Sequence, residues 1–497
     1  MDELPSYALE TDQTALWSFI GYLVLIIGIG IYAARFSSRG ITHFFIGGRK
    51  MGMLVVAMSA VVSGRSAWLL LGVTGMSFEI GFSALWAVLG YTLVEFFLFF
   101  FYAPRIRRFS ESRDCITVPD FFAERFNDRD GSLRAVVVLI IIVFMIAYVS
   151  AQFVAGGKAF SSSFHITETQ GILLTTVIVL FYTMVGGFLA VSLTDTIQGL
   201  FMVVALLVLP IMAILHLGGF GLFFQQASAL SDGQFFNPLA LGFGALIGFL
   251  GIGLGSPGNP HIIARYMSIK DPARLKAVAM VGTSANVLMG LGAIITGMVG
   301  RLYFPDVSLL PGADQENLYP VLASHHLHPV LFGVVIASIF AAIMSTADSQ
   351  LLVAASSVVR DVYEKLIHRD RELPQKRLVL LSRLVVVVLV LISLLLGLMA
   401  EQLVFWLVLF AWAGLGAAFG PTSILALFWK GATRAGMIAG MLSGAVTVIL
   451  WIRIPALSGL MYELIPGFAV ALVVSVVVSR FTRKPDKVDQ LYRAMRE

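Results

Sequence analysis

Long apolar stretches follow one another along almost the whole chain, and this pattern constrains its fold more than any other feature. Each stretch has about 20 residues, the length of a helix that crosses the hydrocarbon core of a bilayer. Hydrophobic residues make up 58% of the 497 residues and charged residues 13%, whereas soluble domains have about 45–50% and 25%. We therefore expect an all-α polytopic membrane protein, and neither a soluble globule nor a disordered chain.

Thirteen spans can be drawn. They cover residues 14–34, 51–75, 82–103, 134–157, 166–188, 190–215, 238–264, 277–300, 328–358, 377–400, 402–428, 434–452 and 464–482. The longest segments between them, 104–134 and 301–327, are too short for a separate domain. We therefore expect residues 1–497 to form one membrane domain. The chain has no Lys or Arg before Arg35, so the first span is expected to stay in place rather than be removed as a signal peptide.

The distribution of basic residues indicates how the chain is oriented. The formal net charge is +5, from 34 Lys and Arg against 29 Asp and Glu. If the N-terminus is outside the cell, 30 of the 34 Lys and Arg residues, Arg265 among them, fall in cytoplasmic segments. Cytoplasmic loops of membrane proteins are enriched in these residues. The sequence therefore predicts a protein of the cytoplasmic (cell inner) membrane, with the N-terminus outside and the C-terminus inside. The excess of positive charge is then explained by the cytoplasmic loops, and no nucleic-acid partner is expected.

Two predicted spans contain residues that interrupt a helix. The second holds Ser63-Gly64-Arg65-Ser66 at mid-depth, and the seventh has four glycines and two prolines between residues 251 and 260. Non-helical backbone is tolerated in a membrane only where it lines a cavity or is buried in protein. Breaks five spans apart predict a five-plus-five inverted repeat, formed by residues 51–215 (spans 2–6) and 238–428 (spans 7–11). One further helix precedes this repeat and two follow it.

Arg65 is the one basic residue that the topology leaves inside a span. It lies about 21 Å from the start of that span, where an arginine is costly unless it faces a polar cavity or a partner. Glu95, near the middle of the third span, is a candidate partner or a proton site. The pair would have either a structural role or a role in transport.

Other polar side chains within the spans suggest cation ligands. The ninth span contains Ser345, Thr346 and Asp348, whose oxygens would either hold an alkali cation or bond to their own backbone. Asp195 would either cap the sixth span or bind a cation. Asp348 and Glu95 are also candidates for carrying a coupling proton.

These features favour a secondary active transporter over other classes. No metalloprotease, hydrolase or phosphate-loop motif is present, so an enzyme is not expected. A transporter-like sensor would be expected to carry an output domain, for which the tail after residue 482 is too short, or to use a separately encoded partner. A channel would need a continuous polar lining. The expected partners are a small solute and the lipid bilayer, with no obligate protein partner.

The chain resembles the solute:sodium symporter family over nearly its whole length, most closely the branch that carries proline. The resemblance rests on segments 45–49, 119–122, 186–198, 258–265, 344–346 and 411–421. It implies a LeuT-type fold, alternating access, and sodium-driven uptake of proline or another amino-acid-like solute. Sodium, as the coupling ion, is the only cofactor that it implies.

The resemblance also implies site residues. A sodium site would use the carbonyls of Val62, Arg65 and Ala342 and the hydroxyls of Ser345 and Thr346, and Asp195 matches a further cation site of some relatives. The implied substrate cavity contains Ser66, Ala67, Trp68, Tyr148, Ile252, Ser256 and Pro260.

Gly64 and Arg65 depart from the pattern, because the proline carriers have an acidic residue and a methionine there. One hypothesis is that Arg65, placed near Ser345 and Thr346, substitutes for sodium, so that protons or solute exchange would drive the transport of a solute other than proline. A second is that its side chain pairs with a substrate carboxylate. A third is that only its carbonyl matters and sodium still binds.

Overall fold

The computed structural model describes residues 13–37, 40–164, 166–369, 373–400, 403–484 and 488–495. Within these ranges the chain is helical and has no strand, only an isolated bridge between Met51 and Ile269. The helices of the N-terminal part are α1 (Gln13–Ser37), α2 (Ile41–Ile46), α3 (Met53–Ala67), α4 (Thr74–Ile80), α5 (Leu85–Phe97), α6 (Ala103–Ser112), α7 (Val118–Phe126), α8 (Ser132–Ser161), α9 (Glu168–His216) and α10 (Phe220–Ala229).

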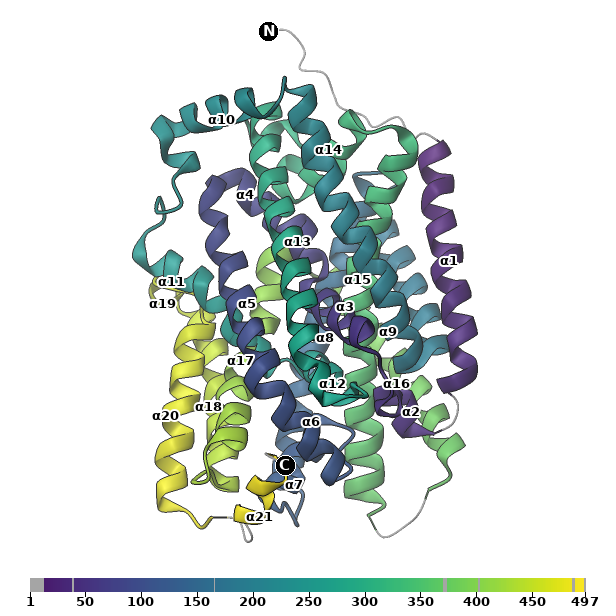
Figure 1. Cartoon of the computed structure of the whole chain (residues 1–497), viewed down its shortest axis with the longest axis vertical. Helices are drawn as coiled ribbons and strands as arrows, with labels where there is room; N and C mark the ends of the chain where they lie inside the picture. Colours follow the sequence, from purple (N-terminus) through teal and green to yellow (C-terminus); the bar gives the residue numbers. More distant parts are fainter. Residues whose placement is uncertain are drawn as a thin grey trace.

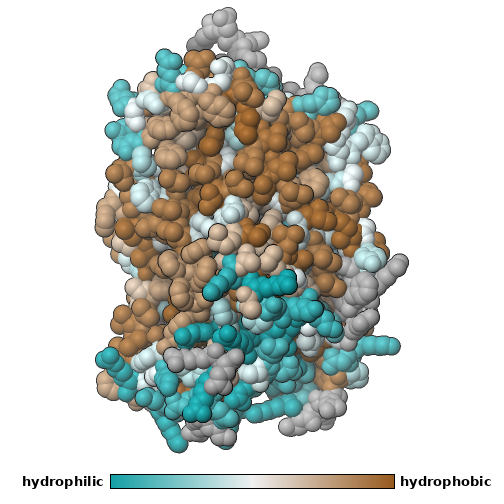
Figure 2. Space-filling model, viewed as in Figure 1, coloured by the Kyte–Doolittle hydropathy of each residue, from teal (hydrophilic) through white to brown (hydrophobic). Residues whose placement is uncertain are grey.

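The helices of the second part are α11 (Phe243–Gly251), α12 (Pro260–Ser268), α13 (Leu275–Tyr303), α14 (Leu318–His326), α15 (Pro329–Ser356), α16 (Gln375–Leu398), α17 (Val404–Phe428), α18 (Arg434–Arg453), α19 (Pro455–Ser458), α20 (Leu464–Phe481) and α21 (Val488–Arg493). The long helices run along the long axis of the molecule (Figure 1). Hydrophobic side chains cover most of the face seen in Figure 2, and hydrophilic ones gather at its lower end, where α6, α7 and α21 lie.

The described residues include ten helical segments that are long and apolar enough to cross a membrane. One of them, Met53–Ser112, contains two of the predicted spans, and Glu168–Met184 and Phe243–Gly258 are shorter apolar helices. The polytopic, all-helical class is therefore confirmed. The number of thirteen spans and the inverted repeat remain predictions.

Helix α9 contains a reversal of the chain at Gly187, whose φ of 65° and ψ of 175° interrupt the helical backbone. The hydroxyls of Tyr182 and Thr194, twelve residues apart, are hydrogen-bonded to each other. In a continuous helix those residues would be about 18 Å apart along the axis. The two parts of α9 therefore fold back on each other, as the boundary predicted between spans five and six requires.

Both predicted helix breaks are present. Helix α3 is interrupted at Ser66, which has a φ of 49° and a ψ of −172°, a region of the backbone map that is almost restricted to glycine. Between α11 and α12 the chain forms a tight 3₁₀ segment, Ile252–Gly258, and then the extended residue Asn259. A Cβ at Gly255 would lie 2.0 Å from Nε1 of Trp412, so glycine is required for the close approach of this break to α17.

Two buried ion-pair networks lie at opposite ends of α8. At its first turn, Arg134 is paired with Asp120 of α7, at 2.6 Å, and with Asp361 in the π-helical continuation of α15, Ser357–Ile367. Arg360 approaches Asp120 from the same segment, at 3.5 Å. Burial raises the pKa of Asp120, but the charges of Arg134 and Arg360 together outweigh it, and the pKa lies below its usual value.

The second network lies near the other end of α8. The ammonium group of Lys158 is 2.6 Å from a carboxylate oxygen of Asp314 and 2.6 Å from one of Glu316. Glu316 also accepts hydrogen bonds from the backbone N–H groups of Val404 and Phe405, the first residues of α17. Burial raises the pKa of Glu316 although Lys158 opposes the shift. These bonds hold α8, the segment before α14 and α17 together.

Candidate functional site

A small cavity lies where the two broken helices meet α8 and α17. Its volume is about 10 Å³, about the space of one water molecule, so in this conformation it is closed. The residues that line it come from both breaks and from the two helices: Gly64, Arg65, Trp68, Tyr148, Ile252, Val408, Leu409 and Trp412. Trp412 donates a hydrogen bond from Nε1 to the carbonyl of Ile252, at 2.8 Å, and so ties the second break to α17.

The side chain of Arg65 points toward α5. Its guanidinium group forms an ion pair with Glu95 and lies 3.7 Å from the centre of the Tyr91 ring. Glu95 also accepts hydrogen bonds from Ser256 of the second break, at 3.2 Å, and from Asn286 of α13, at 2.7 Å. The predicted pairing of Arg65 with Glu95 is therefore present. The prediction that Arg65 lies near Ser345 and Thr346 as a sodium surrogate is wrong, because the guanidinium group is held by α5.

The break in α3 changes the partners of its backbone groups. In a continuous helix the N–H of Ala67 would donate to the carbonyl of Ser63. Here it donates to Oε1 of Gln152 in α8, at 3.2 Å, and the carbonyl of Ser63 accepts from the hydroxyl of Thr346, at 3.1 Å. The break thereby joins α3 to α15, within the stretch 62–65 that was expected to provide sodium ligands.

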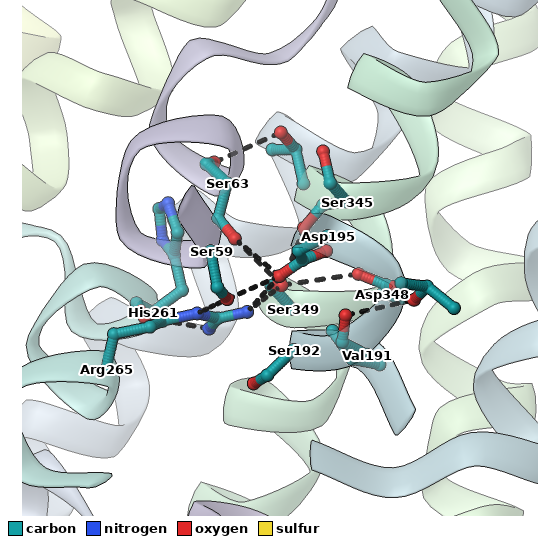
Figure 3. A network of polar contacts seen from close by, with 12 residues as sticks. Ser59, Ser63, Val191, Ser192, Asp195, His261, Arg265, Ser345, Asp348 and Ser349 are labelled. Carbon is teal, nitrogen blue, oxygen red and sulfur yellow. Dashed lines mark hydrogen bonds and ion pairs between the residues drawn. The ribbon is translucent and has the colours of Figure 1, made fainter. Parts of the chain in front are cut away.

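A buried polar network lies beside this junction (Figure 3). Asp195 of α9 accepts hydrogen bonds from the hydroxyls of Ser59, at 2.5 Å, and Ser63, at 3.3 Å, both in α3. Arg265 of α12 is 3.3 Å from the same carboxylate oxygen and is also hydrogen-bonded to Ser349 of α15. Three helices that are far apart in the sequence thus meet at one carboxylate, and α15 joins them through Arg265.

Asp348 adds a second carboxylate to this network. It accepts a hydrogen bond from the hydroxyl of Ser349, at 3.2 Å. The network then holds two carboxylates, Asp195 and Asp348, and one guanidinium group, that of Arg265 (Figure 3). Several buried oxygens around it have no hydrogen-bond partner among the described residues: Oδ1 of Asp195, Oδ2 of Asp348, Oγ of Ser192 and Oε1 of Gln198. When both carboxylates are ionised, the network has one negative charge in excess. Such a charge among buried oxygens without donors is the chemistry that accommodates a hard cation.

In this conformation the hydroxyls of α15 have hydrogen-bond partners within the protein. Ser345 and Ser349 bond to their own helix, at the carbonyls of Ala342 (3.1 Å) and Ser345 (2.6 Å). Thr346 reaches across to α3. Asp195 does not cap a helix, because it lies eight residues beyond the reversal at Gly187 and its carboxylate contacts α3 and α12.

Five of the seven predicted substrate residues lie at or beside the closed cavity. Trp68, Tyr148 and Ile252 line it. Ser66 accepts a hydrogen bond at its hydroxyl from the N–H of Trp68, at 3.1 Å, and Ala67 is the next residue of the break. Ser256 contacts Glu95 instead, and Pro260 is the buried first residue of α12, outside the cavity lining.

The most important residue that the sequence analysis misplaced is Arg265. It was counted in a cytoplasmic segment, but its side chain is 1% exposed and lies in the buried network. The segment Pro260–Ser268 is a buried helix, so a count of basic residues by segment could not separate it from the exposed Lys270. Tyr91, Gln152 and Asn286 were also missed as site residues, and Trp412 was noted only as part of segment 411–421.

Comparison with known proteins identifies the family. The model of the sodium:solute symporter family matches residues 44–444. Proteins named sodium/proline symporter from *Staphylococcus aureus* strains JH9 and NCTC 8325 are each 39% identical over 483 residues, which cover 95% of this chain and 93% of theirs.

Solved structures share the fold. A Na⁺-coupled sialic acid symporter, in a substrate-bound outward-open state, superposes with a TM-score of 0.81 at 19% identity, over 96% of this chain and 100% of that one. A nucleobase-cation-symport-1 family transporter in a closed conformation gives a TM-score of 0.52 at 14% identity, over 91% and 98%. The architecture is therefore that of LeuT-like sodium symporters, and the chain belongs to the sodium:solute symporter family.

Proposed function

We propose that this protein imports proline, or an amino acid of similar size, together with Na⁺. The observation that carries the proposal is the placement of a closed cavity at the junction of two broken helices, directly beside a buried cluster of oxygens. The 39% identity to sodium/proline symporters supports proline as the solute.

The solute would bind where the cavity now lies. Trp68, Tyr148 and Ile252 provide an apolar enclosure that suits a small ring. The volume of about 10 Å³ is far too small for an amino acid, so binding requires the walls to move apart. Alternating access, with an outer and an inner opening, provides that movement.

Two neighbouring positions would hold the cation. The first lies between the α3 break and α15, with the carbonyls of Val62, Arg65 and Ala342 and the hydroxyls of Ser345 and Thr346. The second lies at Asp195 and Asp348, where the oxygens without donors and the excess negative charge support cation binding. Because both positions contact the α3 break, occupation by Na⁺ would stabilise the geometry of the cavity wall.

Uptake into proteoliposomes tests the proposal. Radiolabelled L-proline should accumulate when an inward Na⁺ gradient is applied, and should not accumulate when K⁺ replaces Na⁺. Equal uptake in the two salts would show that Na⁺ does not drive transport. If another amino acid is taken up and proline is not, proline is rejected as the solute but Na⁺-driven transport is not.

An Asp195→Asn variant tests the second cation position. Loss of its charge removes an oxygen ligand and the excess negative charge, so we expect the Na⁺ concentration for half-maximal uptake to rise by about tenfold or more. The matched control is Asp489→Asn, which removes an exposed carboxylate paired with Lys430. An unchanged Na⁺ dependence in Asp195→Asn would exclude this carboxylate from cation binding.

A further inference from the structure

Arg65 is a buried arginine that uses only part of its hydrogen-bonding capacity. A guanidinium group has five N–H donors. Nη2 is paired with Glu95, and one face of the group lies against the Tyr91 ring. Nε is buried and has no hydrogen-bond partner among the described residues. Arg65 also lines the closed cavity.

Glu95 holds this arginine in place and has little capacity left for a solute. One of its carboxylate oxygens accepts from Arg65 and Ser256, and the other accepts from Asn286. These donors come from three different helical segments, and the carboxylate is 3% exposed. Glu95 is also absent from the cavity lining, so it acts behind Arg65.

Trp68 adds a second donor to the same cavity. Its indole Nε1–H is buried without a partner among the described residues, and the residue lines the cavity beside Arg65. The carbonyl of Ile252, by contrast, is already occupied by Trp412. The lining therefore offers donors and one cationic group, between apolar walls formed by Ile252 and residues of α17.

Buried donors without acceptors are unfavourable, and a ligand that supplies acceptors removes that cost. A carboxylate does so best, because its two oxygens match the edge of a guanidinium group. An amino acid adds no net charge to the cavity, whereas a simple anion would add one buried negative charge.

We propose that Arg65 is the specificity residue that binds the carboxylate of the transported amino acid, with Trp68 as a second donor and Glu95 as a positioning residue. This inference rests on the proposed function of the chain as an amino-acid carrier. It makes the carboxylate, rather than the ring of the solute, the main determinant of recognition.

The unmodified protein provides the first test. L-Proline and L-prolinamide differ in the replacement of a carboxylate by a neutral amide, and both can be measured as competitors of radiolabelled L-proline uptake and by thermal stabilisation. We expect the amide to bind about 10- to 100-fold more weakly, the range for a hydrogen bond to a charged group. Equal affinities would overturn the inference. If proline itself does not bind but another amino acid does, proline is rejected as the solute, and the acid and amide of that amino acid decide the role of Arg65.

Variants provide the second test, and the measured quantity is the ratio of acid to amide affinity. In Arg65→Gln the affinity for the acid should fall while the affinity for the amide stays the same, so the ratio should approach one. Arg65→Lys should keep part of the preference for the acid because the charge remains. Glu95→Gln should raise the KM for the acid more than it lowers kcat. A purely structural role would weaken acid and amide equally, and an unchanged ratio in Arg65→Gln would refute the proposal.

The matched control is Arg125→Gln. Arg125 is also fully buried, but it donates from Nε to the carbonyl of Ala426, at 2.9 Å. That carbonyl lies about 21 Å along α17 from Trp412. The control should leave the acid-to-amide ratio unchanged, and a change there would show that the ratio reports a general effect of removing a buried arginine.

Discussion

Ser66 has a backbone conformation that a residue with a side chain rarely adopts, and it does so at the break beside the cavity. Its φ of 49° and ψ of −172° fall in a region that costs about 1–3 kcal/mol for residues other than glycine. The hydroxyl compensates in part, because it accepts a hydrogen bond from the N–H of Trp68. The hydrogen bond therefore favours Ser66 as the residue at which α3 is interrupted, against the cost of its strained backbone.

Comparison of Ser66→Gly with Ser66→Ala isolates the strain, since both variants lose the hydroxyl. We expect the glycine variant to be more stable than the alanine variant by about 1–2 kcal/mol, because only glycine adopts this conformation freely. Thermal unfolding of the purified variants measures the difference. An alanine variant as stable as the glycine variant would show that the backbone at residue 66 relaxes at no cost.

Asp120 is an acid whose ionised form the fold stabilises. Its pKa lies below the usual 3.8, so its contribution to stability is complete above about pH 4 and is lost as the pH falls through the lowered value. Asp120→Asn should destabilise the protein by about 1–3 kcal/mol at pH 7. The difference from the unmodified protein should shrink below pH 4, as measured by thermal unfolding across pH. A difference that is constant through the acid range would show that the charge is not the cause.

Single residues also show which contacts could be predicted from the sequence and which could not. The burial of Arg65 and its pairing with Glu95 could be predicted, because an arginine in the middle of a span requires a partner. The burial of Arg265 could not, since it lies in a short helix next to an exposed basic loop. Only the packing of α12 against α3 brings its guanidinium group to Asp195.

At the scale of elements, the helices follow from local composition and their reversals from single residues. The boundary between spans five and six was predicted at residue 189, and the structure turns the chain two residues earlier, at Gly187. The breaks in α3 and between α11 and α12 lie at the predicted polar and proline-rich positions. Such features can be predicted from the sequence because glycine and proline affect the backbone at their own positions.

Gly187→Ala tests the reversal in α9. A φ of 65° with a ψ of 175° is accessible almost only to glycine, so we expect a loss of about 1–3 kcal/mol in stability and a lower yield of folded protein. Gly21→Ala in α1 is the control, because a Cβ there meets nothing within 4 Å and its φ is ordinary. The two variants should differ in fluorescence-detected thermal unfolding. Equal behaviour would mean that the turn does not depend on Gly187.

At the scale of the whole molecule, buried ion-pair networks at the two ends of α8 join helices from distant parts of the chain. One joins α7, α8 and the continuation of α15, and the other joins α8 to the start of α17. The charge distribution of the sequence implies which end faces the cytoplasm.

Accessibility of introduced cysteines tests that orientation. A membrane-impermeant maleimide should label Asp232→Cys, between α10 and α11, in intact cells, and should label Lys430→Cys, between α17 and α18, only after permeabilisation. Both positions are exposed. Cys115, the only native cysteine, is the internal control, since burial raises the pKa of its thiol well above the usual value and leaves little reactive thiolate. The reverse labelling pattern would reverse the topology.

The sequence by itself determined the all-helical membrane class, the helix breaks, the family and the need of Arg65 for a partner. Each depends on residues close together in the chain or on motifs matched as strings. Tertiary structure alone decided that Arg65 faces Glu95 rather than Ser345 and Thr346, and that Asp195, Arg265, Ser349 and Asp348 form one network. The contacts between helices in these two groups join residues 30 to 84 positions apart, and their geometry depends on how whole helices pack. No local pattern of apolar and polar residues specifies that packing.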